Sequence, residues 1–194
     1  MKVTVIGTGF IGGTLGRALA SSGNEVTFGS RHPDGDDVAG ASAARVTSVQ
    51  DALLSADVVV LALPGAAVSE FTSDYGSTLA GKLVIDATNQ MGAEVANARA
   101  ALPPNVRYAR AFNTLGGENM AEPVFPDGQR ADMFFSAPAA DRGTVEAVVS
   151  GVGLRPVYLG EDQEALVDAL FQIWVTLAFQ QGRGRRMALK LLEA

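Results

Sequence analysis

Three glycines near the start of the chain have the spacing of a phosphate-binding loop. They lie in the run GTGFIG at 7–12, between a predicted strand at 2–6 and a predicted helix at 12–22. In this setting the first glycine permits a tight turn, the second lets the backbone approach a pyrophosphate, and the third lets the helix pack closely on the sheet. The helix N-terminus offers backbone N–H groups to phosphates. The run favours a dinucleotide-binding loop over a turn without a ligand, with contacts from Gly7, Thr8, Gly9, Phe10, Ile11 and Gly12.

The end of the second predicted strand, at 25–28, indicates which dinucleotide is bound. An NAD enzyme usually carries Asp or Glu there, roughly 20 residues after the glycine loop, to hold the ribose 2′-hydroxyl. This chain has Ser30, Arg31 and His32 instead. A serine hydroxyl and a guanidinium suit a 2′-phosphate, arginine can also stack on adenine, and the histidine adds a donor. The segment predicts NADP rather than NAD, the alternative being that Arg31 is a solvated loop residue.

Further polar and apolar residues follow the later predicted strands. In an open α/β sheet, ligands bind across the carboxyl ends of the strands. The turn after the strand at 57–63 is predicted to lie against the ribose and nicotinamide, or else only to end its strand. An amide at the end of the strand at 108–112 is predicted to hold a carboxamide or a second ring system, or else to stabilise its loop. The predicted contacts are Ala62, Leu63, Pro64, Thr88, Asn89, Asn113 and Thr114.

Acid–base groups are scarce at these strand ends, so no catalytic residue is predicted. Asp86 ends the strand at 82–86 and is read either as a base or as the cap of a turn. The chain has no Tyr-x-x-x-Lys pair and only one histidine, so a histidine–acid pair for alcohol chemistry is not expected. A reaction that needs little help from protein acids fits best. Hydride transfer between two redox coenzymes is such a reaction, because the coenzymes carry the chemistry.

Composition excludes several other classes of function. The 194-residue chain carries a net charge of −6, which disfavours nucleic-acid binding. It has no cysteine and one histidine, so no thiolate or multi-histidine metal site is predicted. No apolar run reaches the roughly 18–20 residues of a membrane span, and the start of the chain lacks the pattern of a signal peptide. A cytoplasmic protein is expected.

Alternation of short β-branched runs with helical patterns predicts an α/β fold, a Rossmann-type, doubly wound and mostly parallel sheet. Strands predicted at 133–136 and 155–159 would extend this sheet. A short C-terminal helical extension follows, so the expected division is an NADP-binding domain at 1–160 and an extension at 161–194. The extension is predicted as one or two helices over 165–192, with an apolar stripe that suggests a homodimer. Its arginines at 183–186 are read as a solvated helix face or as a contact for an acidic cosubstrate.

Three segments together resemble one known family. VIGTGFIG at 5–12, GSR at 29–31 and AFNTLG at 111–116 are similar to the F420-dependent NADP reductases, and the similarity covers most of the chain. Members of that family pass a hydride between NADPH and the deazaflavin coenzyme F420. The resemblance implies that Thr8, Ser30 and Arg31 bind the NADP phosphates. It also implies that the turn at 63–64 and the loop at Asn113 surround the nicotinamide and a stacked deazaflavin.

The chain departs from this family at one place, and the sequence allows three functional readings. Acidic Asp34, Asp36 and Asp37 follow Arg31, where family members often carry a further basic residue. The first reading is an NADP(H)-dependent oxidoreductase that passes a hydride between NADPH and a planar acceptor, coenzyme F420. The second is a non-catalytic NADP(H)-binding module that senses redox state or serves a partner. The third, a reductase of an imine or small carbonyl, would need Asp86 as its acid.

Overall fold

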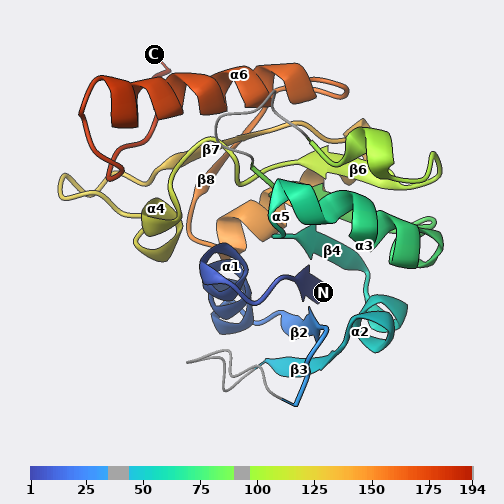
Figure 1. Ribbon diagram of the computed structural model, residues 1–194. Helices are drawn as coiled ribbons and strands as arrows, with labels where there is room; N and C mark the ends of the chain where they lie inside the picture. Colours follow the sequence, from blue (N-terminus) through green and yellow to red (C-terminus); the bar gives the residue numbers. More distant parts are fainter. Residues whose placement is uncertain (35–43, 90–96, 194) are drawn as a thin grey trace. The chain divides into compact units, whose positions relative to one another are not determined.

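The computed structural model describes residues 1–34, 44–89 and 97–193 (Figure 1). It forms two compact units, Met1–Tyr108 and Ala109–Ala194. This division is one of compactness and falls well before the boundary at residue 160 that the sequence suggested for the cofactor-binding domain. That domain boundary stays a prediction. Of the acidic residues after Arg31, Asp36 and Asp37 lie outside the described residues.

Parallel strands form the centre of the first unit. Hydrogen bonding gives a six-stranded sheet in the order β3-β2-β1-β4-β5-β6, and the boundary between the units falls within β6. The order reverses direction between β1 and β4, as in a doubly wound fold, so the predicted Rossmann-type α/β class is confirmed. The strands are β1 (Lys2–Ile6), β2 (Glu25–Ser30), β3 (Arg45–Ser48), β4 (Val58–Leu61), β5 (Leu83–Asp86) and β6 (Arg107–Arg110).

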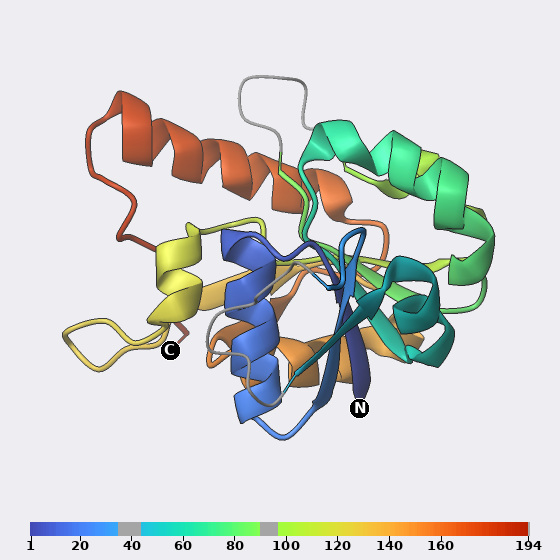
Figure 2. The same ribbon diagram turned by 60° about the horizontal axis from the view of Figure 1, so that its bottom comes forward.

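Helices cover both faces of this sheet, as Figures 1 and 2 show. Neighbouring residues on a strand point to opposite faces of the sheet. Two neighbouring residues on β2 therefore show which helix covers each face. Phe28 contacts the first helix, where a Cβ on Gly16 would lie 2.2 Å from its ring. Gly29 faces the second helix, since a Cβ on Gly29 would lie 3.3 Å from the Cβ of Ala52. The helices of this unit are α1 (Phe10–Ser21), α2 (Val49–Ser55) and α3 (Val68–Tyr75), with 3₁₀ turns at Gly65–Ala67, Gly76–Leu79 and Arg99–Ala101.

An apolar core of the first unit lies on the face that α2 and α3 share. Val49 and Leu53 of α2 and Val68 and Phe71 of α3 meet buried side chains of β1, β4 and β5 there. On the α1 side, Leu15 and Leu19 are fully buried. These two layers hold the strands firmly, so the residues that follow each strand start from fixed positions.

The second unit has its own small sheet. Strands β7 and β8 pair in parallel, and Arg110 makes only an isolated antiparallel bridge to Ser136. The prediction that these strands extend the main sheet was therefore wrong. The elements are α4 (Gly117–Ala121), β7 (Asp132–Phe135), a 3₁₀ turn at Ala139–Asp141, α5 (Arg142–Gly151), β8 (Arg155–Tyr158), α6 (Glu164–Val175) and a π-helical turn at Thr176–Gln180.

The end of the chain differs from its prediction. The helical pattern was expected to continue to residue 192, but helical structure ends at Gln180 and residues 182–193 run back without regular structure. Figure 2 shows this segment returning from the end of α6 towards α4. Gly182 and Gly184 take positive φ angles of 65° and 77°, which lets the chain reverse. Across the described residues, the helices are all too short or too polar to cross a bilayer.

Candidate functional site

The register of the parallel strands brings the predicted residues of the first unit to one edge. Ile6 at the end of β1 pairs with Gly29 of β2 and with Leu61 of β4, and Leu61 pairs with Asp86 of β5. The residues that follow these four positions therefore leave the sheet at the same level. The glycine loop, Ser30, the turn at 62–64 and the segment at 87–89 share this carboxyl edge, as the sequence predicted.

The glycine loop has the geometry of a diphosphate cradle. Gly7 has φ +112°, and a Cβ there would lie 2.5 Å from the carbonyl oxygen of Ala62. A Cβ on Gly12 would lie 1.9 Å from the carbonyl oxygen of Gly7, so this glycine is needed for the helix to approach the loop. A Cβ on Gly9, by contrast, would meet no described atom within 4 Å. A side chain at the second glycine would thus enter space that no described atom occupies, whereas the first and third glycines serve the fold.

The N-terminus of α1 adds backbone donors to this cradle. The helix starts at Phe10 after Gly9, which provides no side-chain cap, and its first turn contains no acidic residue. The first helical hydrogen bond runs from the N–H of Gly13 to the carbonyl of Gly9, at 2.8 Å. The N–H groups of the preceding turn have no acceptor within the helix. Uncapped donors beside open space at Gly9 fit a bound diphosphate.

Ser30, Arg31 and His32, the predicted 2′-phosphate contacts, lie at the end of β2 and in the turn that follows it. The Ser30 side chain is 95% buried, with 5% exposed, and its hydroxyl accepts a hydrogen bond of 2.8 Å from the backbone N–H of His32. This bond forms a tight turn that presents the next two side chains. Arg31 and His32 are both exposed. Among the described residues, the Arg31 guanidinium forms no ion pair or hydrogen bond.

The turn after β4 provides an apolar neighbour for the glycine loop. Its backbone follows β1, since the N–H of Ala62 donates to the carbonyl of Ile6 at 2.9 Å. The Leu63 Cδ2 atom lies 3.6 Å from the position of a Cβ on Gly7. Leu63 is half-buried against the core of the first unit, whereas Pro64 is exposed. The predicted contacts at 62–64 thus border the loop on the side away from β2.

Asp86 caps a turn. The sequence analysis read this residue either as a base or as the cap of a turn, and the second reading is confirmed. Its carboxylate is fully buried and accepts hydrogen bonds from four groups of described residues. Oδ1 accepts from the N–H and the hydroxyl of Thr88 at 2.9 and 2.7 Å, and Oδ2 accepts from the N–H of Ala98 and the hydroxyl of Tyr108, both at 2.7 Å. A carboxylate held in this way is poorly placed to exchange a proton with a substrate.

The carboxylate of Asp86 therefore positions the end of β5 rather than acting on a ligand. Thr88 is fully buried with its hydroxyl proton directed to Asp86, and Asn89 is half-buried. Their role as cofactor contacts stays a prediction. The sequence analysis missed the role of Tyr108, because a separation of 22 positions along the chain hides its contact with Asp86.

Asn113 and Thr114 belong to the second unit. Both side chains are buried, with exposed fractions of 0% and 1%. The Thr114 hydroxyl lies 3.7 Å from the sulfur of Met133, which also accepts from the N–H of Phe112 at 3.1 Å. Phe112 has φ 71°, an uncommon conformation for a residue with a side chain. The loop is thus tightly held within its unit, and its contact with a cofactor stays a prediction.

Arg17 is a further cation near the glycine loop that the sequence analysis missed. A Cβ on Gly13 would lie 3.0 Å from a guanidinium nitrogen of Arg17 and 3.7 Å from the carbonyl oxygen of Thr8. The side chain therefore folds back over α1 towards the loop. The signal was available, because a long side chain in a helix covers the turn that precedes it.

The arginines near the end of the chain are used within the second unit. Arg185 binds Glu118 through two nitrogens at 2.8 and 3.1 Å, and the pKa of Glu118 is lowered chiefly by this hydrogen bond. Arg186 donates to Asn119 Oδ1 and to the carbonyl oxygens of Glu118, Glu122 and Val124. These two side chains therefore neither form a solvated helix face nor remain free to contact an acidic cosubstrate.

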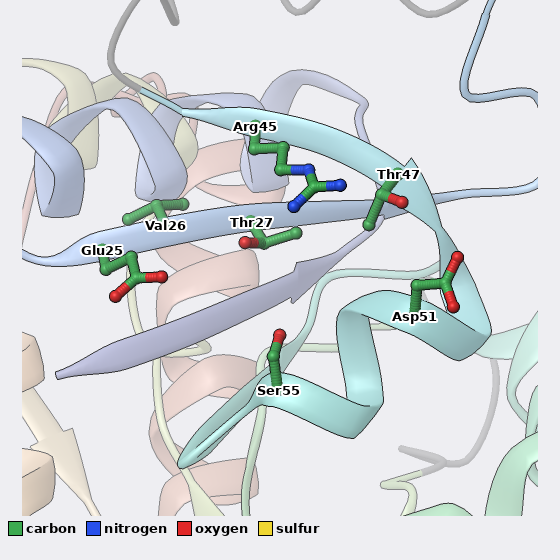
Figure 3. Close-up of a pocket in the computed structure, with 7 residues that line it drawn as sticks. All are labelled: Glu25, Val26, Thr27, Arg45, Thr47, Asp51 and Ser55. Atoms are coloured by element: carbon green, nitrogen blue, oxygen red, sulfur yellow. The ribbon is translucent and has the colours of Figure 1, made fainter.

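A cavity of about 250 Å³ lies elsewhere in the first unit, between β2, β3 and α2 (Figure 3). In the view of Figure 3, Arg45 extends over Thr27 towards Thr47. Predicted cofactor contacts do not occur among its lining residues, which are Glu25, Val26, Thr27, Arg45, Thr47, Asp51 and Ser55. Because Glu25 and Arg45 begin their strands, the cavity extends to the amino ends of β2 and β3, away from the carboxyl edge.

Comparison with known proteins agrees with the cradle and with the fold. Residues 2–90 match the family described as NADP oxidoreductase, coenzyme F420-dependent. The resemblance inferred from the sequence is therefore confirmed for this part of the chain. A crystal structure of a candidate F420-dependent NADP reductase from an Arthrobacter species has a TM-score of 0.80 at 23% identity, with both chains covered completely. At this identity the likeness shows the fold.

Two curated relatives are longer proteins. Metalloreductase STEAP3 of Rattus norvegicus is 28% identical over 167 residues, which cover 82% of this chain and 34% of the relative. Glycerol-3-phosphate dehydrogenase [NAD(P)+] of Chlorobium phaeobacteroides is 27% identical over 184 residues, covering 84% of this chain and 54% of the relative. The chain thus spans about a third and about half of their lengths. All three named proteins are reductases or dehydrogenases.

Proposed function

Residues 2–90 match the family of coenzyme F420-dependent NADP oxidoreductases, and on this premise we propose that the chain is an NADP(H)-dependent oxidoreductase. It would bind NADPH along the carboxyl edge of the first unit and transfer a hydride between NADPH and a planar acceptor, with coenzyme F420 as that acceptor. When bound, the nicotinamide supplies the hydride. The chain's own residues bind the two phosphate regions and orient the dinucleotide.

The observation that carries this proposal is the turn at Ser30. It presents Arg31, which has no carboxylate partner among the described residues, at the position where an NAD enzyme would hold the ribose with an acid. The missing acid removes a repulsion, and the guanidinium adds an attraction for the 2′-phosphate. Both effects favour NADP over NAD, and the cradle around Gly9 accounts for binding of the diphosphate that the two dinucleotides share.

Replacement of Arg31 tests the proposal. Arg31→Ala should weaken NADPH binding by about 1.5–3 kcal/mol, the value of a charge-assisted hydrogen bond, and should leave NADH binding nearly unchanged. Titration of the purified chain with each dinucleotide, followed by nucleotide fluorescence, measures both affinities. Gly9→Val is the non-selective control: its side chain enters space that no described atom occupies, so the variant should fold and lose both dinucleotides. An equal loss of NADPH and NADH in Arg31→Ala would refute the assignment.

The state of Asp86 favours hydride transfer to a ring acceptor over reduction of an imine or a small carbonyl. The latter reaction would need a proton donor, and the sequence offered only Asp86 for that role. Its four hydrogen bonds and complete burial leave it unsuited to the task. A deazaflavin accepts the hydride on its own ring and can take the proton that completes its reduction from solvent, so an acid from the protein is not required.

A non-catalytic NADP(H)-binding module is the second candidate, and the same lack of an available acid at the edge favours it. The two functions separate in one assay, in which NADPH oxidation is followed by absorbance in the presence of coenzyme F420. Turnover supports the oxidoreductase. Tight NADPH binding without turnover on F420 or on simple flavins would support the module instead.

We also propose a homodimer, formed through the exposed stripe of α6 and the turn after it. Leu166 and Ile173 are 49% and 48% exposed, and Leu170 and Leu177 are partly buried beside them. These four residues follow the alternating spacing of four and three residues that aligns apolar side chains on one face of a helix. The same stripe on two copies can pair with itself. A mass of two chains by light scattering is the expected result.

A further inference from the structure

Phe10 is a large apolar side chain in an unusual place. It is the first residue of α1, directly after the open glycine Gly9, and it is 58% exposed. Single exposed apolar side chains are common on protein surfaces, so exposure alone says little. The place is more informative. The Cα–Cβ bond of a helical residue tilts towards the helix N-terminus, so the ring of Phe10 leans towards the carboxyl edge, where the dinucleotide would lie.

The neighbours of Phe10 at this edge are apolar as well. Ile11 is partly exposed, and the turn after β4 contributes the partly exposed Leu63 and the exposed Pro64. The turn abuts the loop, because Leu63 and Ala62 both lie close to the Cβ position of Gly7. The two segments, 7–12 and 62–67, contain no charged residue. Together they form what we call the apolar rim, which comprises Phe10, Ile11, Leu63 and Pro64.

The two sides of the glycine loop therefore differ in chemistry. On the β2 side are the hydroxyl of Ser30 and the cation of Arg31, where the adenosine half of a dinucleotide is read. The nicotinamide half must then extend to the opposite side of the loop, towards β4, where the apolar rim lies. An acceptor that receives a hydride has to lie against the nicotinamide. It would meet Phe10 and its apolar neighbours there, and neither segment would offer a cation to an acceptor phosphate.

We propose that Phe10 is a specificity-determining residue that packs its ring against the flat face of the acceptor. This inference rests on the proposed function. The side chain is already exposed in the free protein, so a flat apolar ring gains by covering it. Small charged acceptors gain little from the same surface. Phe10 thereby selects ring acceptors over small phosphorylated ones, whereas Arg31 selects the dinucleotide.

The test compares Phe10→Ala and Phe10→Trp with Leu54→Ala in the full chain. Leu54 is a matched control, since it is 64% exposed on α2 and lies away from the carboxyl edge. NADPH affinity is measured by fluorescence titration, and KM is measured for coenzyme F420 and for riboflavin. Phe10→Ala should raise the KM of both rings about tenfold, the factor that corresponds to about 1.4 kcal/mol of lost contact. The NADPH affinity of Phe10→Ala should change less than about threefold. Phe10→Trp, which keeps an aromatic ring, should retain the wild-type KM.

Direct binding separates this inference from the proposed function. Quenching of riboflavin fluorescence by the NADP-loaded protein reports ring binding without turnover. If the wild-type chain reduces no acceptor, the proposed function fails, and weaker quenching in Phe10→Ala than in Leu54→Ala still supports the contact. The inference is overturned if Phe10→Ala binds and reduces both rings like Leu54→Ala. It is also overturned if NADPH affinity falls as much as ring affinity, because Phe10 would then serve the dinucleotide alone.

Discussion

Two buried carboxylates, one in each unit, show how differently the two parts of the chain use charge. Asp86 of the first unit is surrounded by neutral donors, two backbone N–H groups and two hydroxyls. Asp132 of the second unit is surrounded mainly by cations. Arg155 donates to both of its oxygens at 2.7 and 2.6 Å, Lys190 donates at 2.8 Å, and the N–H of Leu191 completes the set at 2.8 Å.

The same contrast holds for the arginines. Arg31 at the carboxyl edge of the first unit has no carboxylate partner within the described part of the chain, whereas Arg155, Arg185 and Arg186 of the second unit all bind acidic side chains. A guanidinium that already holds a carboxylate is costly to redirect to a ligand. The comparison teaches that the number of basic residues in a segment does not indicate an anion site, whereas their state of pairing does.

Removal of Asp132 should produce the largest change in stability. Asp132→Ala leaves Arg155 and Lys190 without their shared partner and releases the backbone at Leu191, so the free energy of unfolding should fall by about 3 kcal/mol. Urea denaturation measures it. Glu146→Ala is the control in the same unit, since its exposed ion pair with Arg142 is worth only about 0.3–0.5 kcal/mol. A loss at Asp132 no greater than that of the control would remove the contrast between the two carboxylates.

Replacement of Asp86 should cost somewhat less and act on the first unit. Asp86→Asn keeps the shape but turns one acceptor into a donor that faces the N–H of Ala98 and the hydroxyl of Tyr108, at a cost of about 2 kcal/mol. Tyr108→Phe removes only one hydrogen bond, about 1 kcal/mol, and serves as the comparison. Thermal unfolding of both variants ranks the two losses. The neutral-donor account fails if Asp86→Asn is as stable as the wild type.

Acidification should give the smallest effect, confined to the second unit. Burial alone would raise the pKa of Asp132, but the hydrogen bonds from Arg155, Lys190 and Leu191 lower it below its ordinary value. The pKa of Glu118 is lowered as well, chiefly by Arg185. A lowered pKa in the folded state stabilises the fold at every pH above the unfolded value, about 4, and this stabilisation is lost as the pH falls through the folded value.

Trp174 reports this loss, because its ring N–H donates to the carbonyl of Met187 at 3.1 Å, in the segment that Arg185 and Lys190 hold. Its fluorescence should stay constant from neutral pH down to about 4 and change below it. Far-UV circular dichroism over the same range shows whether the helices remain. A change in Trp174 emission that is complete above pH 5 would contradict the assignment to Asp132 and Glu118.

Whether the sequence predicted a feature of this molecule depends on how far apart along the chain the contacting residues lie. The loop at 7–12 and the Ser30–Arg31 turn were found because each depends on a few consecutive residues between two predictable elements. The final helix expected after the break at 182–184 was wrong, although its apolar spacing was suitable. Its arginines and lysine instead bind partners about 60 residues earlier in the chain, and these contacts outweigh a local preference for helix.

For this protein, then, local sequence alone determined the parallel α/β class, the glycine loop between β1 and α1 and the missing acid after β2, because glycine conformation and strand periodicity are local properties. Only the tertiary structure decided what Asp86 and Asp132 do, and which arginines remain available to a ligand. A carboxylate has the same sequence signature as a base or as a cap, and only the donors that folding brings around it distinguish the two roles.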